Sequence, residues 1–299
     1  MSASLVLAAS MQEAVDELAA GARPVAGGTD LVVGARQGKA PLPERLVAIH
    51  RLSALGELSQ DAESLTIGAL VSHHRLAEHA LVRERLTALA DACAIVGSHA
   101  TRAHGTLGGN LMNASPAMES GGPLLCFGAT VTLRSARGGR QLAIDELLAG
   151  PGQTTASDDE LLEQVAVPLP PAGTGSCYLR LEYRRQMEIA VVGATAVLSL
   201  DGERVSDARV AITALAPTIR RVPEAEAALT GSDGGADAVR AAAGAIEQAG
   251  KPISDVRASA RYRSAMAAVI GRRAIEAALA RARGNEVPIP ASPALHGGL

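Results

Sequence analysis

Two glycine-rich segments are the parts of this 299-residue chain whose residue types and spacing best suit ligand binding. The first, residues 26–31, reads Ala-Gly-Gly-Thr-Asp-Leu, and the second, residues 105–111, reads Gly-Thr-Leu-Gly-Gly-Asn-Leu. Glycine has no Cβ, so backbone N–H groups there can approach an anion closely, and each segment adds a hydroxyl side chain. Together the two segments predict a diphosphate that is held from two sides.

Side chains that would perform covalent or metal chemistry are not arranged for it. His73, His74 and His79 lie close together in sequence but lack the spacing of a zinc site, so we expect them to face solvent. No Cys-x-x-Cys pair occurs, so we expect buried thiols rather than a zinc ribbon, an iron–sulfur cluster or a disulfide. The three thiols are those of Cys93, Cys126 and Cys177. We predict neither a catalytic residue nor a metal ligand in this chain.

The composition is that of a globular protein, with 47% apolar and 20% charged residues. Only four residues are aromatic, three Tyr and one Phe, so the core must be built from aliphatic side chains. A net charge of −3 argues against a nucleic-acid partner. The longest mostly apolar run, residues 190–200, is too short to span a membrane, and the N-terminus lacks the pattern of a secretory signal. We therefore expect a cytoplasmic protein.

The elements around the first glycine segment follow a β-α-β order. Ser10 and Glu13 have the spacing of a capping box, which predicts a helix that begins at Met11 and ends before Gly21. An apolar stretch at residues 24–26 then runs into the glycine turn, where we expect Thr29 and Asp30 to cap a second helix. Further strands are expected at residues 46–49 and 65–67, and a largely helical segment at residues 76–94.

Breaker residues divide the second half of the chain. Proline and glycine are densest at residues 168–175, which predicts a domain boundary between residues 1–172 and residues 176–284. Beyond it, residues 191–200 and 208–215 read as a β-hairpin or meander with an Asp-Gly turn at residues 201–202. Helices are expected at residues 236–249 and 256–283, followed by a loosely held tail at residues 285–299.

Five segments in order resemble the FAD-binding medium subunits of molybdenum hydroxylases, the xanthine dehydrogenase and carbon monoxide dehydrogenase group. They read AGGTDL, GTLGGNLMNASPAMESGGPLL, ELLEQVAVP, RRQMEIAVVGATAVLSLDG and PISDVRASARYR, and they span nearly the whole chain. The resemblance implies an α+β fold with a two-lobed FAD-binding domain of the vanillyl-alcohol-oxidase type, its lobes at about residues 1–55 and 56–172. It also implies a smaller C-terminal α+β domain with a three-stranded antiparallel sheet.

The resemblance also assigns roles to individual residues. The pyrophosphate of FAD would lie along the first segment, with an arginine just before it, and the second segment would form a second clamp. These residues are Arg23, Ala26, Gly27, Gly28, Thr29, Asp30 and Leu31 in the first group, and Thr106, Gly108, Gly109 and Asn110 in the second. Glu119 stands where the family usually has Asp, and would accept hydrogen bonds from ribose or ribityl hydroxyls. Leu162 would lie against the isoalloxazine, and Arg180 would lie near the flavin.

The cofactor of this chain would be FAD, and the protein would be an oxidoreductase subunit. The implied partners are a large subunit that holds molybdopterin and hydroxylates the substrate, and a small subunit whose 2Fe–2S clusters pass electrons to FAD. The implied assembly is a dimer of heterotrimers, and the electron acceptor would be NAD, a quinone or oxygen. Two other functions stay open, a self-contained flavin oxidase and a non-redox nucleotide-binding assembly protein.

Overall fold

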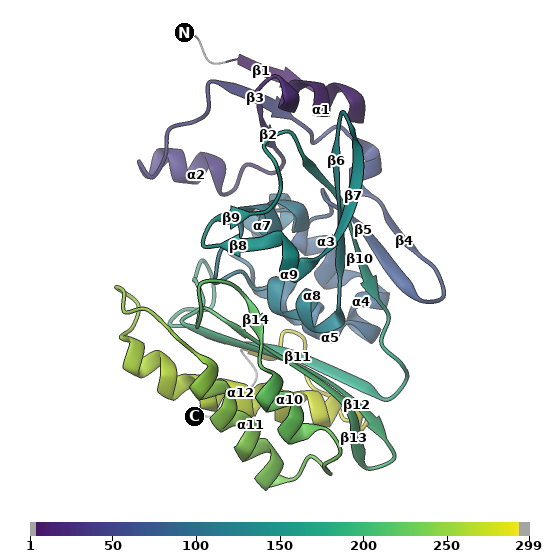
Figure 1. The fold of residues 1–299 in the computed structure, drawn as a ribbon, viewed down its shortest axis with the longest axis vertical. Coiled ribbons are helices and arrows are strands. Elements are labelled where there is room, and N and C mark those ends of the chain that lie inside the picture. Colours follow the sequence, from purple (N-terminus) through teal and green to yellow (C-terminus); the bar gives the residue numbers. More distant parts are fainter. Residues whose placement is uncertain (1–3, 293–299) are drawn as a thin grey trace.

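The computed structural model describes residues 4–292, which form three stacked parts. Figure 1 shows a small N-terminal lobe at the top, a larger lobe with a twisted sheet in the middle and a C-terminal α+β domain at the bottom. The predicted α+β class with two lobes and a second domain is therefore confirmed. Within residues 4–292, no helix has the length and apolar character needed to cross a membrane.

The N-terminal lobe is a three-stranded parallel sheet covered by one helix. Its strands, in the order β1-β3-β2, are β1 (Ser4–Leu7), β3 (Arg45–Ala48) and β2 (Arg23–Val25). The helix α1 (Met11–Ala19) begins where the sequence predicts, because Ser10 Oγ accepts a hydrogen bond of 3.1 Å from the N–H of Glu13. Val15 and Leu18 are buried against the sheet, and the first glycine segment follows β2 directly.

The middle lobe is an antiparallel sheet packed against short helices. Its strands, in the order β4-β5-β10-β6-β7, are β4 (Leu58–Gln60), β5 (Ser64–Gly68), β10 (Leu161–Pro168), β6 (Thr130–Ser135) and β7 (Gly138–Ala143). The helices are η1 (Ser53–Gly56), α3 (His73–Glu78), α4 (Ala80–Arg85), α5 (Thr87–Ile95), α6 (His99–His104), α7 (Leu107–Asn113), α8 (Gly121–Phe127) and α9 (Ile144–Leu147). A small hairpin, β8 (Leu148–Gly150) and β9 (Gln153–Thr154), completes the lobe. The helical segment expected at residues 76–94 is broken because the backbone leaves the helical region at His79 and Leu86.

The C-terminal domain contains the three long antiparallel strands that we expect, with a fourth strand of two residues at one edge. The strands are β11 (Thr174–Leu181), β12 (Val192–Asp201), β13 (Arg204–Thr213) and β14 (Arg220–Arg221), and the helices are α10 (Pro223–Leu229), α11 (Ala236–Ala249) and α12 (Ala260–Ala282). One face of the sheet packs on α12, and the other packs on α5 and α8 of the middle lobe. The apolar run at residues 190–200 is therefore the central strand β12, which is buried on both faces.

A buried ion pair links the two domains. Asp91 on α5 has no exposed surface, and its carboxylate accepts hydrogen bonds of 2.6 and 3.0 Å from the guanidinium of Arg281 on α12. Asp91 also accepts a hydrogen bond of 3.0 Å from the N–H of Ala291. Ala291 and Ser292 are fully buried, so the expectation of a loosely held tail does not hold for these two residues, whereas residues 285 and 286 are exposed. Residues 293–299 lie outside the described residues.

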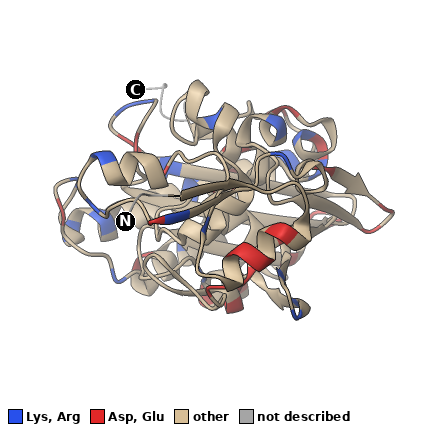
Figure 2. Ribbon diagram, turned by 90° about the horizontal axis from the view of Figure 1, so that it is seen from above, with Lys and Arg blue, Asp and Glu red and all other residues tan. Residues whose placement is uncertain are grey.

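Charged side chains are distributed over the whole ribbon. Figure 2 looks from the end that carries the N-terminal lobe, and shows Lys and Arg on many elements, mixed with Asp and Glu. Several of the ion pairs among the described residues are exposed and join residues close in sequence, such as Arg240 with Asp237. Two buried pairs, Asp91 with Arg281 and Glu119 with Arg180, instead join the two domains.

Candidate functional site

The two glycine segments form turns that lie in direct contact. A Cβ on Gly27 would lie 1.9 Å from the carbonyl oxygen of His104, the residue before the second turn. A Cβ on Gly105 would lie 3.5 Å from the hydroxyl oxygen of Thr29 in the first turn. The structure thus brings together residues that are far apart in the sequence, as the prediction of a two-sided grip requires.

The first turn has backbone donors that no other group uses. It joins β2 to α2 (Leu31–Arg36), and Gly28 adopts a positive φ of +69°, which glycine accepts without strain. Among the described residues, the N–H groups of residues 27–30 donate no hydrogen bond to another group. The expected cap differs in detail, because Asp30 alone occupies the N-cap and makes no side-chain hydrogen bond. These N–H groups are available to an anion.

The second turn uses its backbone donors differently from the prediction. The N–H groups of Leu107 and Gly108 donate to the carbonyls of Val71 and Ala69 at 3.0 and 2.9 Å, and that of Gly109 donates to Thr106 Oγ1 at 3.0 Å. Two amides of this turn therefore hold it against Ala69 and Val71, and a third caps the helix within the turn, so the idea of two equivalent bare turns is wrong. A Cβ on Gly108 would also lie 2.7 Å from Ala69, so this glycine serves close packing.

Two side chains, and the N–H of Thr106, remain as the second turn's means of contacting a ligand. The Thr106 hydroxyl oxygen accepts from the N–H of Gly109, which leaves its hydrogen as a donor. Asn110 Oδ1 accepts a hydrogen bond of 2.6 Å from the hydroxyl of Ser120, which leaves the Nδ2 amide group of Asn110 to donate to a ligand. Both residues belong to the predicted second clamp.

His73 lies next to the second turn, although the sequence pattern did not identify it as a site residue. We expected it to face solvent, but it is 1% exposed at the first position of α3, directly behind the second turn. Burial, and then the charge of Arg102, lower the pKa of its imidazole to about 4, so the ring is neutral at physiological pH. A signal was present in the sequence, because Leu76 and Ala77 lie three and four residues further on and share its buried helix face.

Glu119 and Arg180 meet in a buried cluster between the domains. Arg180 on β11 is fully buried, and its guanidinium pairs with the carboxylate of Glu119 and, at 2.6 Å, with that of Glu182. Burial raises the pKa of Glu119, and the charge of Arg180 offsets part of that effect. The expected roles of both residues toward a flavin stay predictions, and the structure gives them a first role in joining the domains.

The remaining predicted residues lie at different depths. Arg23 is exposed on β2, and Leu31 is half-buried at the start of α2. Leu162 is 2% exposed and packs in the core of the middle lobe. Its predicted place against an isoalloxazine is untested, and its visible role is in the core.

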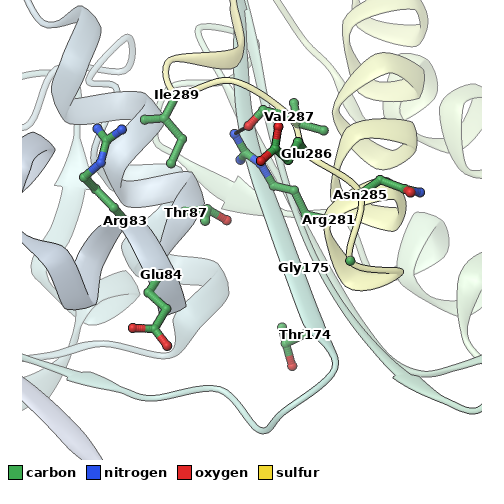
Figure 3. Close-up of a pocket in the computed structure, with 11 residues that line it drawn as sticks. Arg83, Glu84, Thr87, Thr174, Gly175, Arg281, Asn285, Glu286, Val287 and Ile289 are labelled. Atoms are coloured by element: carbon green, nitrogen blue, oxygen red, sulfur yellow. Dashed lines mark hydrogen bonds between the residues drawn. The ribbon is translucent and has the colours of Figure 1, made fainter.

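A cavity of about 250 Å³ lies elsewhere on the domain boundary. Figure 3 shows Arg83 and Glu84 of α4 on one side and Arg281 on the other, with Thr174 at the start of β11. No residue of the two turns lines it, and its volume is below the roughly 300–1,000 Å³ of typical small-molecule sites. The adjoining turns, rather than this cavity, are the candidate site.

Comparison with known proteins decides the family. Residues 1–170 match the model of the FAD binding domain in molybdopterin dehydrogenase, and residues 178–278 match that of the CO dehydrogenase flavoprotein C-terminal domain. This chain is a member of the FAD-binding medium subunits of molybdopterin dehydrogenases. It is thus an oxidoreductase subunit with an FAD-binding domain, and the predicted resemblance is confirmed.

Individual relatives of this medium-subunit family cover almost the whole chain. The 6-hydroxypseudooxynicotine dehydrogenase complex subunit alpha of Paenarthrobacter nicotinovorans is 32% identical over 93% of this chain and 95% of its own length. The carbon monoxide dehydrogenase medium chain of Afipia carboxidovorans is 30% identical, over 88% and 90%. The solved carbon monoxide dehydrogenase from Hydrogenophaga pseudoflava superposes with a TM-score of 0.90 at 31% identity, covering 94% of this chain and 98% of that chain.

Proposed function

We propose that this chain is the electron-transferring flavoprotein subunit of a multi-subunit, molybdopterin-dependent hydroxylase. FAD on this chain would receive electrons from 2Fe–2S clusters of a small subunit, while a large subunit with molybdopterin oxidises the substrate. An external acceptor, NAD, a quinone or oxygen, would then take the electrons. The relatives named as subunits of dehydrogenase complexes support this proposal, as does their near-complete coverage of the chain. Such an assembly would be a dimer of heterotrimers in the cytoplasm.

The observation that carries the proposal is the contact between the two glycine turns. FAD supplies the redox chemistry itself, so the protein has to bind the cofactor, orient it and set its surroundings. The free N–H groups of residues 27–30 would hold the diphosphate, as backbone donors do in other anion sites. Thr106 and Asn110 would add side-chain donors from the second turn. Arg23, Ala26 and Leu31 would flank the diphosphate along the first turn.

Glu119, Leu162 and Arg180 would belong to the flavin end of the site. A ribityl hydroxyl that donates to Glu119 would share its carboxylate with Arg180, since the two side chains are already paired. The guanidinium of Arg180 is flanked by two carboxylates. Their negative charges would offset much of the positive charge that a nearby flavin experiences. We therefore expect these residues to fix the angle between the domains at least as much as the flavin potential.

The test is anaerobic reduction of the flavin with and without partners. The chain is purified from its native host with whatever subunits accompany it, and separately as the isolated chain with FAD bound. We expect the complex to contain molybdenum and iron, and we expect organic substrates to bleach the flavin only in the complex. Bleaching of the isolated chain by an organic substrate would instead indicate a self-contained oxidase. An isolated chain that binds no flavin would indicate an assembly protein.

A further inference from the structure

The imidazole of His73 lies immediately behind both glycine turns. Its ring carbon Cδ2 is 3.5 Å from the Cβ position of Gly105, which in turn is 3.5 Å from Thr29 Oγ1 of the first turn. The backbone N–H of His73 donates to the carbonyl of Gly105 at 3.1 Å, and Ser72 forms a β-bridge with Thr106. The ring therefore contacts the second turn at Gly105, and Gly105 lies between the ring and Thr29 of the first turn.

Within residues 4–292, the ring also has an unpaired polar atom, a property that it shares with His79 at the other end of α3. Its Nδ1 atom is buried and has no hydrogen-bond partner among the described residues. A buried, unpartnered nitrogen is costly in a protein interior, and such groups often belong to functional sites. The other histidine at the start of α3, His74, is exposed and offers no such environment.

We propose that His73 belongs to the diphosphate site and takes up a proton when FAD binds. The proposal rests on the proposed function, because FAD supplies the negative charge. A diphosphate on the two turns brings that charge close to the ring, and an anion within about 4–6 Å favours the protonated form of a histidine. The imidazolium would then neutralise part of the diphosphate charge from behind the second turn.

Other charged groups near the ring do not supply this response. Arg102 on α6 disfavours the imidazolium by its positive charge, and its guanidinium is held by the carbonyl of Val96 and by the ring of His99. Helices α4, α5 and α6 pack against α3. The other titratable or charged residues of these four helices are His74, Arg75, Glu78, Arg83, Glu84, Arg85, Asp91, Cys93 and His104. Asp30 flanks the first turn. Asp91 is already paired with Arg281, so no buried carboxylate of these helices competes for the proton.

The sign of the effect follows from linkage. Without ligand the pKa of His73 is about 4, and the bound anion raises this pKa. Binding therefore consumes a proton at pH values between the free and the bound pKa. FAD affinity should therefore weaken as the pH rises through this window, by up to about tenfold per pH unit, and level off above it.

The experiment measures FAD binding to the apoprotein by titration calorimetry, in buffers of different ionisation enthalpy, between about pH 5 and pH 7. The buffer dependence of the heat counts the protons taken up. We expect uptake in the wild type and in the matched control His74→Asn, and loss of the uptake and of its pH dependence in His73→Asn. No uptake in the wild type, or equal uptake in His73→Asn, would overturn the inference while FAD binding itself stands.

A second measurement covers the case in which His73→Asn does not fold. Nitrogen-15 NMR of histidine-labelled wild-type protein reports the protonation of each ring directly. We expect the titration of a single buried ring to move to higher pH when FAD is added. An unmoved titration overturns the inference, and a failure to bind FAD at all overturns both it and the proposed function.

Discussion

Replacing Gly27 by alanine tests the contact between the two turns. A Cβ at this position would lie 1.9 Å from the carbonyl oxygen of His104 and 2.7 Å from its carbon, whereas ordinary contact begins at 3.4 Å. Both atoms belong to the backbone, so the first turn must retreat from the second by about 1.5 Å. Overpacking of this size costs about 1–3 kcal/mol. If that cost falls on the FAD-bound arrangement, the dissociation constant for FAD rises about 5- to 150-fold.

The assay is equilibrium titration of the apoprotein with FAD, followed by flavin fluorescence, with thermal unfolding measured in parallel. Gly34→Ala is the matched control, because this glycine of α2 has no atom within 4 Å of its Cβ position. The control should bind FAD as the wild type does. The reasoning is refuted if Gly27→Ala folds normally and binds FAD as tightly as Gly34→Ala.

Three further predictions concern the rest of the molecule. Asp91→Asn leaves the charge of buried Arg281 without its carboxylate and should lower the free energy of unfolding, measured in urea, by about 3–5 kcal/mol. The control Asp237→Asn, at an exposed pair, should change it by less than about 0.5 kcal/mol. Equal losses would contradict the domain-linking role. Burial alone would raise the pKa of Asp255, but hydrogen bonds from the N–H of Arg257 and the guanidinium of Arg263 lower it to about 2. The ionised carboxylate therefore stabilises the folded protein above the unfolded pKa near 3.8, and this stabilisation is lost as the pH falls toward 2. Asp255→Asn should remove about 1 kcal/mol of that acid dependence, a modest amount because the carboxylate is partly solvated, and an unchanged acid unfolding curve would count against it. Burial also raises the pKa of the thiols of Cys93, Cys126 and Cys177, so a thiol reagent should label them only after denaturation, and rapid labelling of the native protein would contradict their placement.

Local patterns in the sequence were enough to predict much of the fold. The cap at Ser10, the hairpin turn at residues 201–202 and the helix at residues 236–249 depend on neighbours in the chain, and all three are present. The apolar run at residues 190–200 is buried on both faces, which its composition indicates. The sequence pattern did not predict the short strand β14 or the helix α10. Strand β14 depends on pairing with the edge strand β13, which a local pattern does not contain.

The candidate site shows the same division between local and tertiary information. Glycines and hydroxyl residues predict two turns, but only the tertiary pairing with Ala69 and Val71 shows that the N–H groups of Leu107 and Gly108 are already used. Arg180 is buried because Glu119, 61 residues earlier, meets it across the domain boundary. The spacing of His73, Leu76 and Ala77 indicates that His73 is buried, but its contact with the second turn depends on tertiary packing that α3 alone does not predict.

The visible absorption spectrum of the purified chain, with the nucleotide released on denaturation, tests the central claim most directly. The two adjoining turns should retain the dinucleotide, so we expect the two-band absorption of a flavin and release of about one FAD per chain. A folded, colourless protein that releases no nucleotide, even after incubation with FAD, would contradict the account.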